Sequence, residues 1–120
     1  MQTLTCTNTN KGLAIRDALD MVGGKWKLPI LHVLVFHGGP MRFKELQRAL
    51  DGITARMLSK ELKELEMNQM VNRQVYDTAP ITVEYSVTDY GHSLCPVIQA
   101  LYEWGTEHRR RIFEPVSADY

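Results

Sequence analysis

The stretch FKELQRALDGITARMLSKELKELEMNQMVNRQVYDTAPITVEY, Phe43 to Tyr85, reads as two short helices followed directly by two strands. The second helical segment is apolar on one face, at Leu58, Leu62 and Leu65, and basic on the other. An amphipathic helix of this kind packs its apolar face on a core and leaves the opposite face free. After Met70 apolar and polar residues alternate, which is typical of a half-buried strand and its hairpin partner.

This order of elements predicts a winged helix-turn-helix, an α+β fold that is mainly helical. The short, glycine-containing connection at Asp51-Gly52 is the turn that such a motif requires. The basic helix, about 54–68, is then expected to enter the major groove of duplex DNA. The β-hairpin wing, about 70–87, would make a second contact.

Helical periodicity continues on both sides of this stretch. Ile15 and Leu19 share one helix face from about residue 11, and Gly23-Gly24 is expected to end that helix. The next helix, about 25–36, is apolar nearly all round, which indicates a central buried helix anchored by Trp26.

The remaining boundaries follow from capping residues and prolines. Met41-Arg42 is expected to add a short strand, and Thr54 to cap the basic helix. A last helix should run from Thr88-Asp89 to about Phe113, with a kink or a weakened hydrogen bond at Pro96, because proline cannot donate a helical hydrogen bond. The expected organisation is a flexible arm at 1–10, one domain at 11–113 and a tail at 114–120.

The composition fits one soluble domain. With 120 residues, 44% of them hydrophobic, the chain can bury its own core. No stretch approaches the roughly 18 apolar residues of a membrane span, and the polar N-terminus lacks a signal-peptide pattern. We therefore expect a cytoplasmic protein that does not enter a membrane, with reduced thiols at Cys6 and Cys95.

The charge is distributed unevenly. Fourteen basic and fourteen acidic residues give a formal net charge of zero, so the overall charge does not indicate nucleic acid. Six of the basic residues nevertheless fall between Arg42 and Lys63. A local basic patch attracts phosphates within a Debye length of about 8 Å, whatever the distant charges do.

Candidate DNA contacts follow from position on the basic helix, and a merely solvated charged stripe is the alternative. Side chains near the start of a recognition helix face base edges, while cations farther along meet phosphates. The expected base contacts are Thr54, Ala55, Arg56 and Ser59. The expected phosphate contacts are Lys60, Lys63, Arg42, Lys44, Arg73, Lys25 and Lys27.

No pattern indicates catalysis, a metal site or a cofactor. The four histidines lack HxxxH or HExxH spacing, and no nucleophile has a neighbouring base. Gly23-Gly24-Lys25 lacks both the spacing of a phosphate-binding loop and a preceding strand, so helix capping explains it better.

The terminal helices are expected to form a homodimer. A helix as long as the last one extends beyond a small winged-helix core, so part of its apolar stripe needs another partner. A two-fold dimer would place two recognition helices about 34 Å apart, one DNA turn. The expected interface residues are Ile15, Leu19, Leu94, Val97, Ile98, Leu101, Trp104 and Ile112.

The sequence is similar to the HxlR-type transcriptional regulators, a MarR-related branch of the winged-helix proteins. The resemblance covers roughly Leu13 to Gly105. It rests on ALDMVGGKWK (18–27), RFKELQRALDGIT (42–54), LSKELKELE (58–66) and VEYSVTDYGHSL (83–94). It implies a homodimeric DNA-binding repressor or activator.

Two positions depart from the family pattern. Many members carry a Cys-Pro pair thirteen residues before the tryptophan of GGKW, where this chain has Leu13-Ala14. The cysteine that some members use for sensing is therefore missing from its usual place. Family wings often present an arginine just before VEY, where this chain has Ile81-Thr82, which implies that the wing contact is weaker or is supplied by Arg73 and the hairpin backbone.

Other interpretations remain open from the sequence. A winged helix that binds another protein is the main alternative, and the zero net charge favours it slightly. A thiol oxidoreductase using Cys6 and Cys95 lacks an activating environment, so we expect Cys6 to be an ordinary free thiol. An unknown small-molecule effector could bind between the dimer helices and the core, although no residue pattern identifies one.

Overall fold

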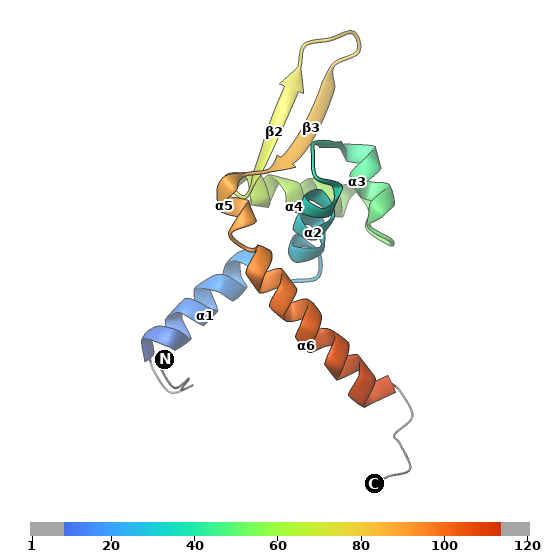
Figure 1. Ribbon diagram of the computed structural model, residues 1–120. Helices are drawn as coiled ribbons and strands as arrows, with labels where there is room; N and C mark the ends of the chain where they lie inside the picture. Colours follow the sequence, from blue (N-terminus) through green and yellow to red (C-terminus); the bar gives the residue numbers. More distant parts are fainter. Residues whose placement is uncertain (1–8, 114–120) are drawn as a thin grey trace.

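The computed structural model describes residues 9–113 and shows a small body from which two helical arms and a hairpin project (Figure 1). Cys6 and the expected flexible arm and tail lie outside or at the edge of the described residues. The elements are α1 (Thr9–Val22), α2 (Lys27–His37), β1 (Met41–Arg42), α3 (Phe43–Ala49), α4 (Ala55–Met67), β2 (Val71–Tyr76), β3 (Thr82–Val87), α5 (Asp89–His92) and α6 (Cys95–Phe113).

Helix α2 is the centre of the body, as its continuous apolar sequence predicts. Its Ile30 and Leu31 are completely buried, and they pack in one cluster with Leu46 of α3 and with Leu58 and Leu62 of α4. Trp26, the residue before α2, is also buried in this cluster, so its expected role as a core anchor is confirmed. The helix begins at Lys27, two residues later than predicted.

Helices α3 and α4 form the predicted helix-turn-helix. Gly52 in the turn adopts a φ of +89°, a left-handed conformation that glycine takes without steric cost. Ile53 is buried and ties the turn to the core. The backbone N–H of Met57 donates a 3.1 Å hydrogen bond to Oγ1 of Thr54, which confirms Thr54 as the cap of α4.

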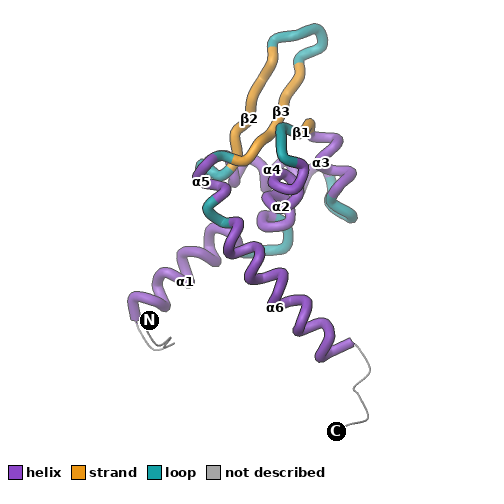
Figure 2. Tube along the Cα trace, viewed as in Figure 1, coloured by secondary structure: helices purple, strands orange, loops and turns teal. Residues whose placement is uncertain are grey.

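The three strands form an antiparallel sheet in the order β1-β3-β2, and β2 and β3 extend it into the wing (Figure 2). Met41 and Arg42 pair with Tyr85 and Glu84, so the expected short strand is present. The half-buried pattern expected for β2 is wrong beyond Val71, since residues 72–76 are exposed. The hairpin leaves the body after its first pairs, and the core covers neither face there (Figure 1).

The expected single last helix is instead two helices, α5 and α6, with the break before Pro96 rather than a kink at it. Proline in mid-helix would clash with the carbonyl group four residues earlier, here that of His92. Pro96 is instead the second residue of α6, and a backbone N–H at this position would have no carbonyl acceptor within the helix.

Helices α1 and α6 leave the same end of the body in different directions, opposite the wing (Figure 1). The radius of gyration is 17.8 Å, whereas a compact chain of this length would have about 13–14 Å. None of the described helices is long and apolar enough to cross a membrane. The large radius of gyration reflects the two projecting helices, α1 and α6, which the rest of the described chain leaves largely exposed.

Candidate nucleic-acid interface

Helix α4 has one buried face and one open face. Leu58, Leu62 and Leu65 are almost completely buried. The side chains proposed for base and phosphate contact, which are Thr54, Ala55, Arg56, Ser59, Lys60 and Lys63, are all exposed. The core therefore holds the helix by its leucines and turns the predicted contact residues to the surface together.

The start of α3 lies beside the wing. Arg42 belongs to β1, where it pairs with Glu84 of β3, and it also directly precedes α3. Its backbone N–H donates to Oε1 of Glu45 at 2.9 Å, so this carboxylate occupies one donor near the helix N-terminus. The side chains of Arg42 and Lys44 remain exposed.

The wing carries Arg73 in the middle of β2, opposite Tyr85 of β3. Arg73 is exposed, and it lies nearer the body than the tip does. At the tip, Oγ1 of Thr78 donates to the carbonyl oxygen of Pro80 at 2.6 Å, and Ile81 is exposed. The tip thus presents an apolar residue, and the arginine is set back from it.

Lys27, which was expected to contact phosphate, is instead held inside the body by two carboxylates. Its side chain is buried, and Nζ donates to Oε1 of Glu61 and to Oε1 of Glu64, both at 2.6 Å. Burial lowers the pKa of Lys27, but the two carboxylates outweigh burial and raise it above its ordinary value. The ammonium therefore binds to α4 on the side that faces the core.

Lys60 contacts the same two carboxylates from the outer side. Its Nζ lies 3.4 Å from Oε2 of Glu64 and 3.9 Å from Oε2 of Glu61, while its side chain is 67% exposed. The pKa of Glu64 is held below its ordinary value by Lys27 first and by Lys60 second. We call Lys27, Lys60, Glu61 and Glu64 the charge cluster. The sequence did not predict this cluster, because its one indication was a lysine in the first turn of a buried helix, far along the chain from the two glutamates.

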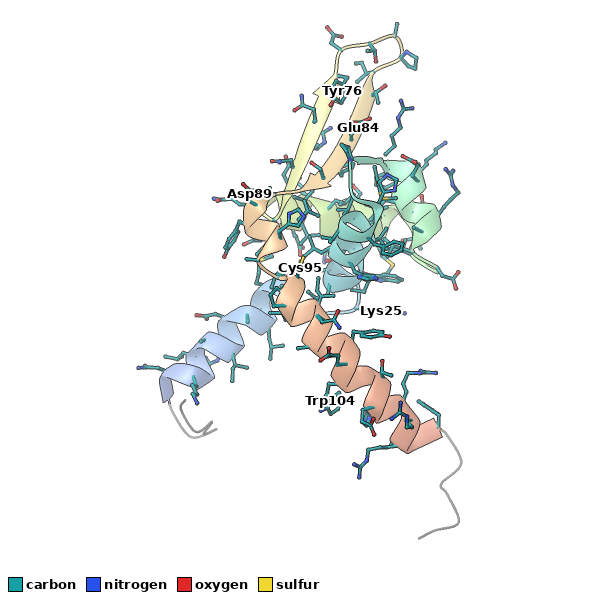
Figure 3. All side chains as sticks on the ribbon, in the orientation of Figure 1. Lys25, Tyr76, Glu84, Asp89, Cys95 and Trp104 are labelled. Atoms are coloured by element: carbon teal, nitrogen blue, oxygen red, sulfur yellow. The ribbon has the colours of Figure 1, made fainter. Side chains whose placement is uncertain are left out.

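Lys25 lies at the foot of α2, at the opposite end of the body from the wing (Figure 3). Its ammonium lies 5.1 Å from the centre of the Trp26 ring, close enough for a cation–π contact. The structure therefore does not bring Lys25 to the wing, and it places Lys25 over the tryptophan of the core.

The two arms expose most of the apolar residues expected at a dimer interface. Ile15 and Leu19 of α1 are about three-fifths exposed, and Trp104 of α6, which stacks on His108, is 67% exposed (Figure 3). Leu94 and Ile98 differ, because they pack against the core of their own chain. The residues that stay exposed along both arms are Ile15, Leu19, Val97, Leu101, Trp104 and Ile112.

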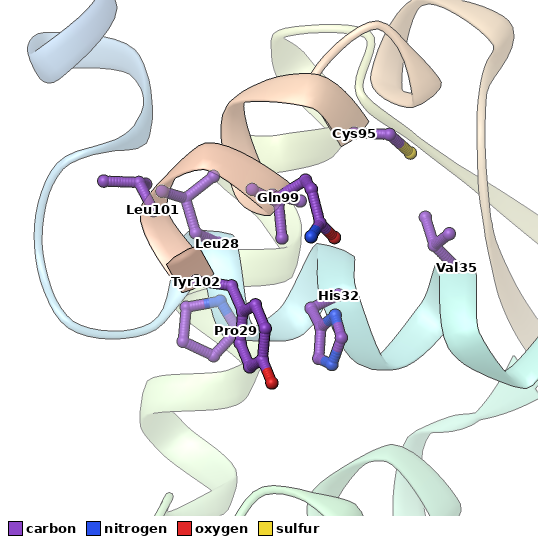
Figure 4. A pocket seen from close by; sticks show the side chains of 9 residues that line it. Leu28, Pro29, His32, Val35, Cys95, Gln99, Leu101 and Tyr102 are labelled. Atoms are coloured by element: carbon purple, nitrogen blue, oxygen red, sulfur yellow. The ribbon is translucent and has the colours of Figure 1, made fainter. Parts of the chain in front are cut away.

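An open groove of about 600 Å³ lies between α2 and the first half of α6 (Figure 4). Leu28, Pro29 and Leu101 supply apolar surface, and His32, Gln99 and Tyr102 supply polar atoms. No lysine, arginine, aspartate or glutamate is among the described residues that line it. No group of histidine, cysteine or carboxylate side chains suited to a metal ion occurs within residues 9–113.

Comparison with known proteins places this geometry in a family. The family described as HxlR-like helix-turn-helix matches residues 21–113. The chain is 40% identical over 102 residues to the uncharacterized HTH-type transcriptional regulator YdeP of Bacillus subtilis, covering 85% of this chain and 78% of that protein. It is 42% identical over 92 residues to an uncharacterized HTH-type transcriptional regulator of Methanothermobacter thermautotrophicus, covering 77% and 69%.

Solved structures agree with the sequence relatives. The redox regulator HypR in its reduced form superposes with a TM-score of 0.75 at 40% identity, covering 84% of this chain and 97% of that one. Its oxidized form gives a TM-score of 0.72 at 39% identity, covering 78% and 95%. The fold and the sequence thus point to the same group of proteins.

Proposed function

Because this chain belongs to the HxlR-like helix-turn-helix family and is a DNA-binding transcriptional regulator, we propose that it grips operator DNA as a homodimer with α4 in the major groove. The observation that carries this proposal is the open face of α4. Arg56, Ser59, Lys60 and Lys63 are exposed on a helix whose opposite face is fixed in the core. A recognition helix has to be held in this way.

The roles along α4 follow from the chemistry of each side chain. Arg56 is suited to a bidentate contact with guanine, Thr54 and Ser59 can adapt to several base edges, and Ala55 can meet a thymine methyl group. Lys60 and Lys63 lie farther along the helix and are assigned to phosphates. The phosphate contacts position the protein, and the base contacts select the sequence.

The wing and the start of α3 are assigned to the flanking backbone. Arg42, Lys44 and Arg73 are exposed, and β1 joins the wing to α3 through its pairing with β3. The exposed Ile81 at the tip favours backbone contact by the set-back Arg73 over a charged contact at the tip. These contacts would hold the DNA on either side of α4.

Homodimer formation through α1 and α6 is supported by the apolar residues that both arms expose. Exposed apolar residues that gather along two projecting helices usually mark an interface. We assign this interface to a two-fold dimer, which would present two α4 helices to successive major grooves.

For a small-molecule effector, we propose the groove between α2 and α6. Its apolar lining with a few polar atoms and no charged side chain suits an uncharged, partly apolar compound. Occupancy there would act on the first half of α6, which links the DNA-binding body to the dimer arm.

The test is a gel-shift titration against the intergenic DNA upstream of the chain's own coding sequence, with a scrambled duplex as competitor, at two salt concentrations. We expect a shift that survives the competitor and weakens steeply with salt. Arg56→Ala should cost about 1–3 kcal/mol of binding free energy. Arg111→Ala, an exposed arginine on α6, is the matched control and should bind as the wild type does.

Two results would contradict the proposal. Equal loss to the scrambled duplex would remove sequence-specific binding and favour the protein-interaction alternative. Equal affinity of the Arg56→Ala variant and the wild type would show that α4 does not enter the groove as assigned.

A further inference from the structure

The charge cluster joins the central helix to the recognition helix at a buried site. Lys27 lies in the first turn of α2, and its ammonium is 2.6 Å from one oxygen of Glu61 and one oxygen of Glu64. The side chains of Lys27 and Glu61 are only 11% and 17% exposed. The ammonium thus reaches both carboxylates from behind, through the face of α4 that packs on the body.

The two lysines of the cluster divide the carboxylate oxygens between them. Lys27 contacts the Oε1 atom of each glutamate, whereas Lys60 lies near the Oε2 atoms. Lys60 is at a longer distance, 3.4 Å from Glu64, and it is largely exposed. Exposed pairs of this kind contribute little free energy, so Lys60 can leave Glu64 at small cost.

The carboxylates would otherwise oppose DNA binding by α4. Within Ala55–Met67 the acidic residues Glu61, Glu64 and Glu66 equal the basic residues in number, so the helix has no net charge of its own. A phosphate that contacts Lys60 would lie well within a Debye length, about 8 Å, of the Glu64 carboxylate. Without Lys27, that carboxylate would repel the phosphate and hold Lys60 back from it.

We propose that Lys27 is a positioning residue for DNA binding: its buried ammonium offsets one of the two negative charges of Glu61 and Glu64 from behind and so frees Lys60 for a phosphate. This inference rests on the proposed placement of α4 against DNA. A buried lysine would thus affect DNA affinity through the glutamates that it contacts. It also explains why two glutamates are compatible with the basic helix of a DNA-binding protein.

A purely structural ion pair is the competing explanation, and stability alone does not separate the two. Replacing all members of a buried ion pair by neutral groups is often neutral or stabilising, whereas removing one member leaves a buried charge unpaired. Lys27→Met would therefore lower stability under both explanations. Only the competition between Glu64 and a phosphate predicts that Lys27→Met weakens DNA binding per folded molecule and that neutral glutamines restore it.

The experiment measures the affinity of the full chain and its variants for a fluorescein-labelled mixed-sequence duplex of about 30 base pairs, long enough for two half-sites. Fluorescence anisotropy gives the affinity at two salt concentrations, and thermal unfolding of the same samples shows the folded fraction. We expect Lys27→Met to weaken binding about tenfold at the lower salt, because carboxylate–phosphate repulsion is least screened there. The triple variant Lys27→Met/Glu61→Gln/Glu64→Gln should return to within about threefold of the wild type.

The double variant Glu61→Gln/Glu64→Gln keeps Lys27 and tests the carboxylate side of the inference even where Lys27→Met does not fold. It should bind the duplex at least as tightly as the wild type, since the repelling carboxylates are gone. Weaker binding by the folded double variant would overturn the inference, as would wild-type affinity in folded Lys27→Met or no recovery in the triple variant. If the wild type binds neither this duplex nor the upstream intergenic DNA of the gel-shift test, the proposed function fails, and the inference fails with it.

Discussion

Glu64 shows how a single residue takes its properties from three-dimensional neighbours. The hydrogen bond from Lys27 and the charge of that ammonium hold the pKa of the Glu64 carboxyl below its ordinary value of 4.5, and Lys60 acts in the same direction. Lys27 shows the reverse shift, with a pKa above its ordinary 10.5, because the two carboxylates outweigh its burial. Both groups are therefore charged together over a broad pH range.

These shifts predict a pH dependence of stability. A carboxyl whose pKa is lowered by folding stabilises the folded state above its unfolded pKa, and this stabilisation is lost as pH falls through its folded pKa. The contribution of Glu64 should therefore be complete at neutral pH and decline below its ordinary pKa of 4.5. The contribution of Lys27 has the opposite sign and should be lost only as pH rises above 10.5.

Denaturant unfolding of the wild type and Glu64→Gln over a pH series would measure the Glu64 contribution. The difference in unfolding free energy between them should be constant near neutral pH and shrink on acidification. Glu66→Gln is the matched control, since Glu66 is exposed on the same helix and has no ion pair within residues 9–113. A Glu64→Gln difference that does not change at low pH would contradict the assigned cause.

At the scale of elements, α5 packs closely against the sheet. The backbone N–H of Gly91 donates to Oγ1 of Thr88 at 2.8 Å, and the Thr88 hydroxyl donates to the carbonyl oxygen of Gln69 at 2.6 Å. A Cβ atom at Gly91 would collide with the carbonyl oxygen of Met70 and lie 2.7 Å from Cγ1 of Val87. Only glycine lets α5 lie this close to the strands.

Gly91→Ala should therefore destabilise the body, by about 1–3 kcal/mol, since backbone cannot move away as a flexible side chain can. Gly39, in the loop before β1, is the matched control, because a Cβ atom there meets nothing within 4 Å and its φ is not positive. Gly39→Ala should be neutral or slightly stabilising. Urea unfolding of the two variants would compare them, and equal stability would show that α5 can shift away from the strands.

At the scale of the whole molecule, the long axis is set by the arms and the wing. The principal extents are 63 × 39 × 25 Å, far from the dimensions of a compact domain. No residue of α6 is buried within the described chain, although its sequence has an apolar stripe. A second copy of the chain is the partner that the proposed dimer supplies for this stripe.

Replacing Leu101 and Trp104 by glutamate should convert the dimer to a monomer, because two charges would then lie in an apolar interface. Sedimentation equilibrium would measure the mass, and DNA affinity should fall with dimer loss, since one α4 helix remains per molecule. Ile81→Glu is the matched control for the mass measurement alone: Ile81 is 64% exposed, but it lies at the wing tip, away from both arms. A monomeric wild type, or a dimeric double variant, would contradict the proposed interface.

The amino-acid sequence by itself determined most of the elements of this protein. Hydrophobic periodicity, the Thr54 cap and the glycine turn are local signals, and they correctly predicted the helix-turn-helix, the central helix and the hairpin. The same signals identified the open face of α4. They failed where a boundary depended on competing local effects, as at Pro96, where the chain breaks into α5 and α6.

Only the tertiary structure decided which charges meet. Lys27 is separated from Glu61 by 34 residues and from Glu64 by 37, so no spacing rule along the chain relates them. The packing of α2 across α4 brings them together, and it converts an expected DNA contact into a buried partner of two carboxylates. Electrostatic interactions depend on distance in space and on burial, and both are set only when the helices pack.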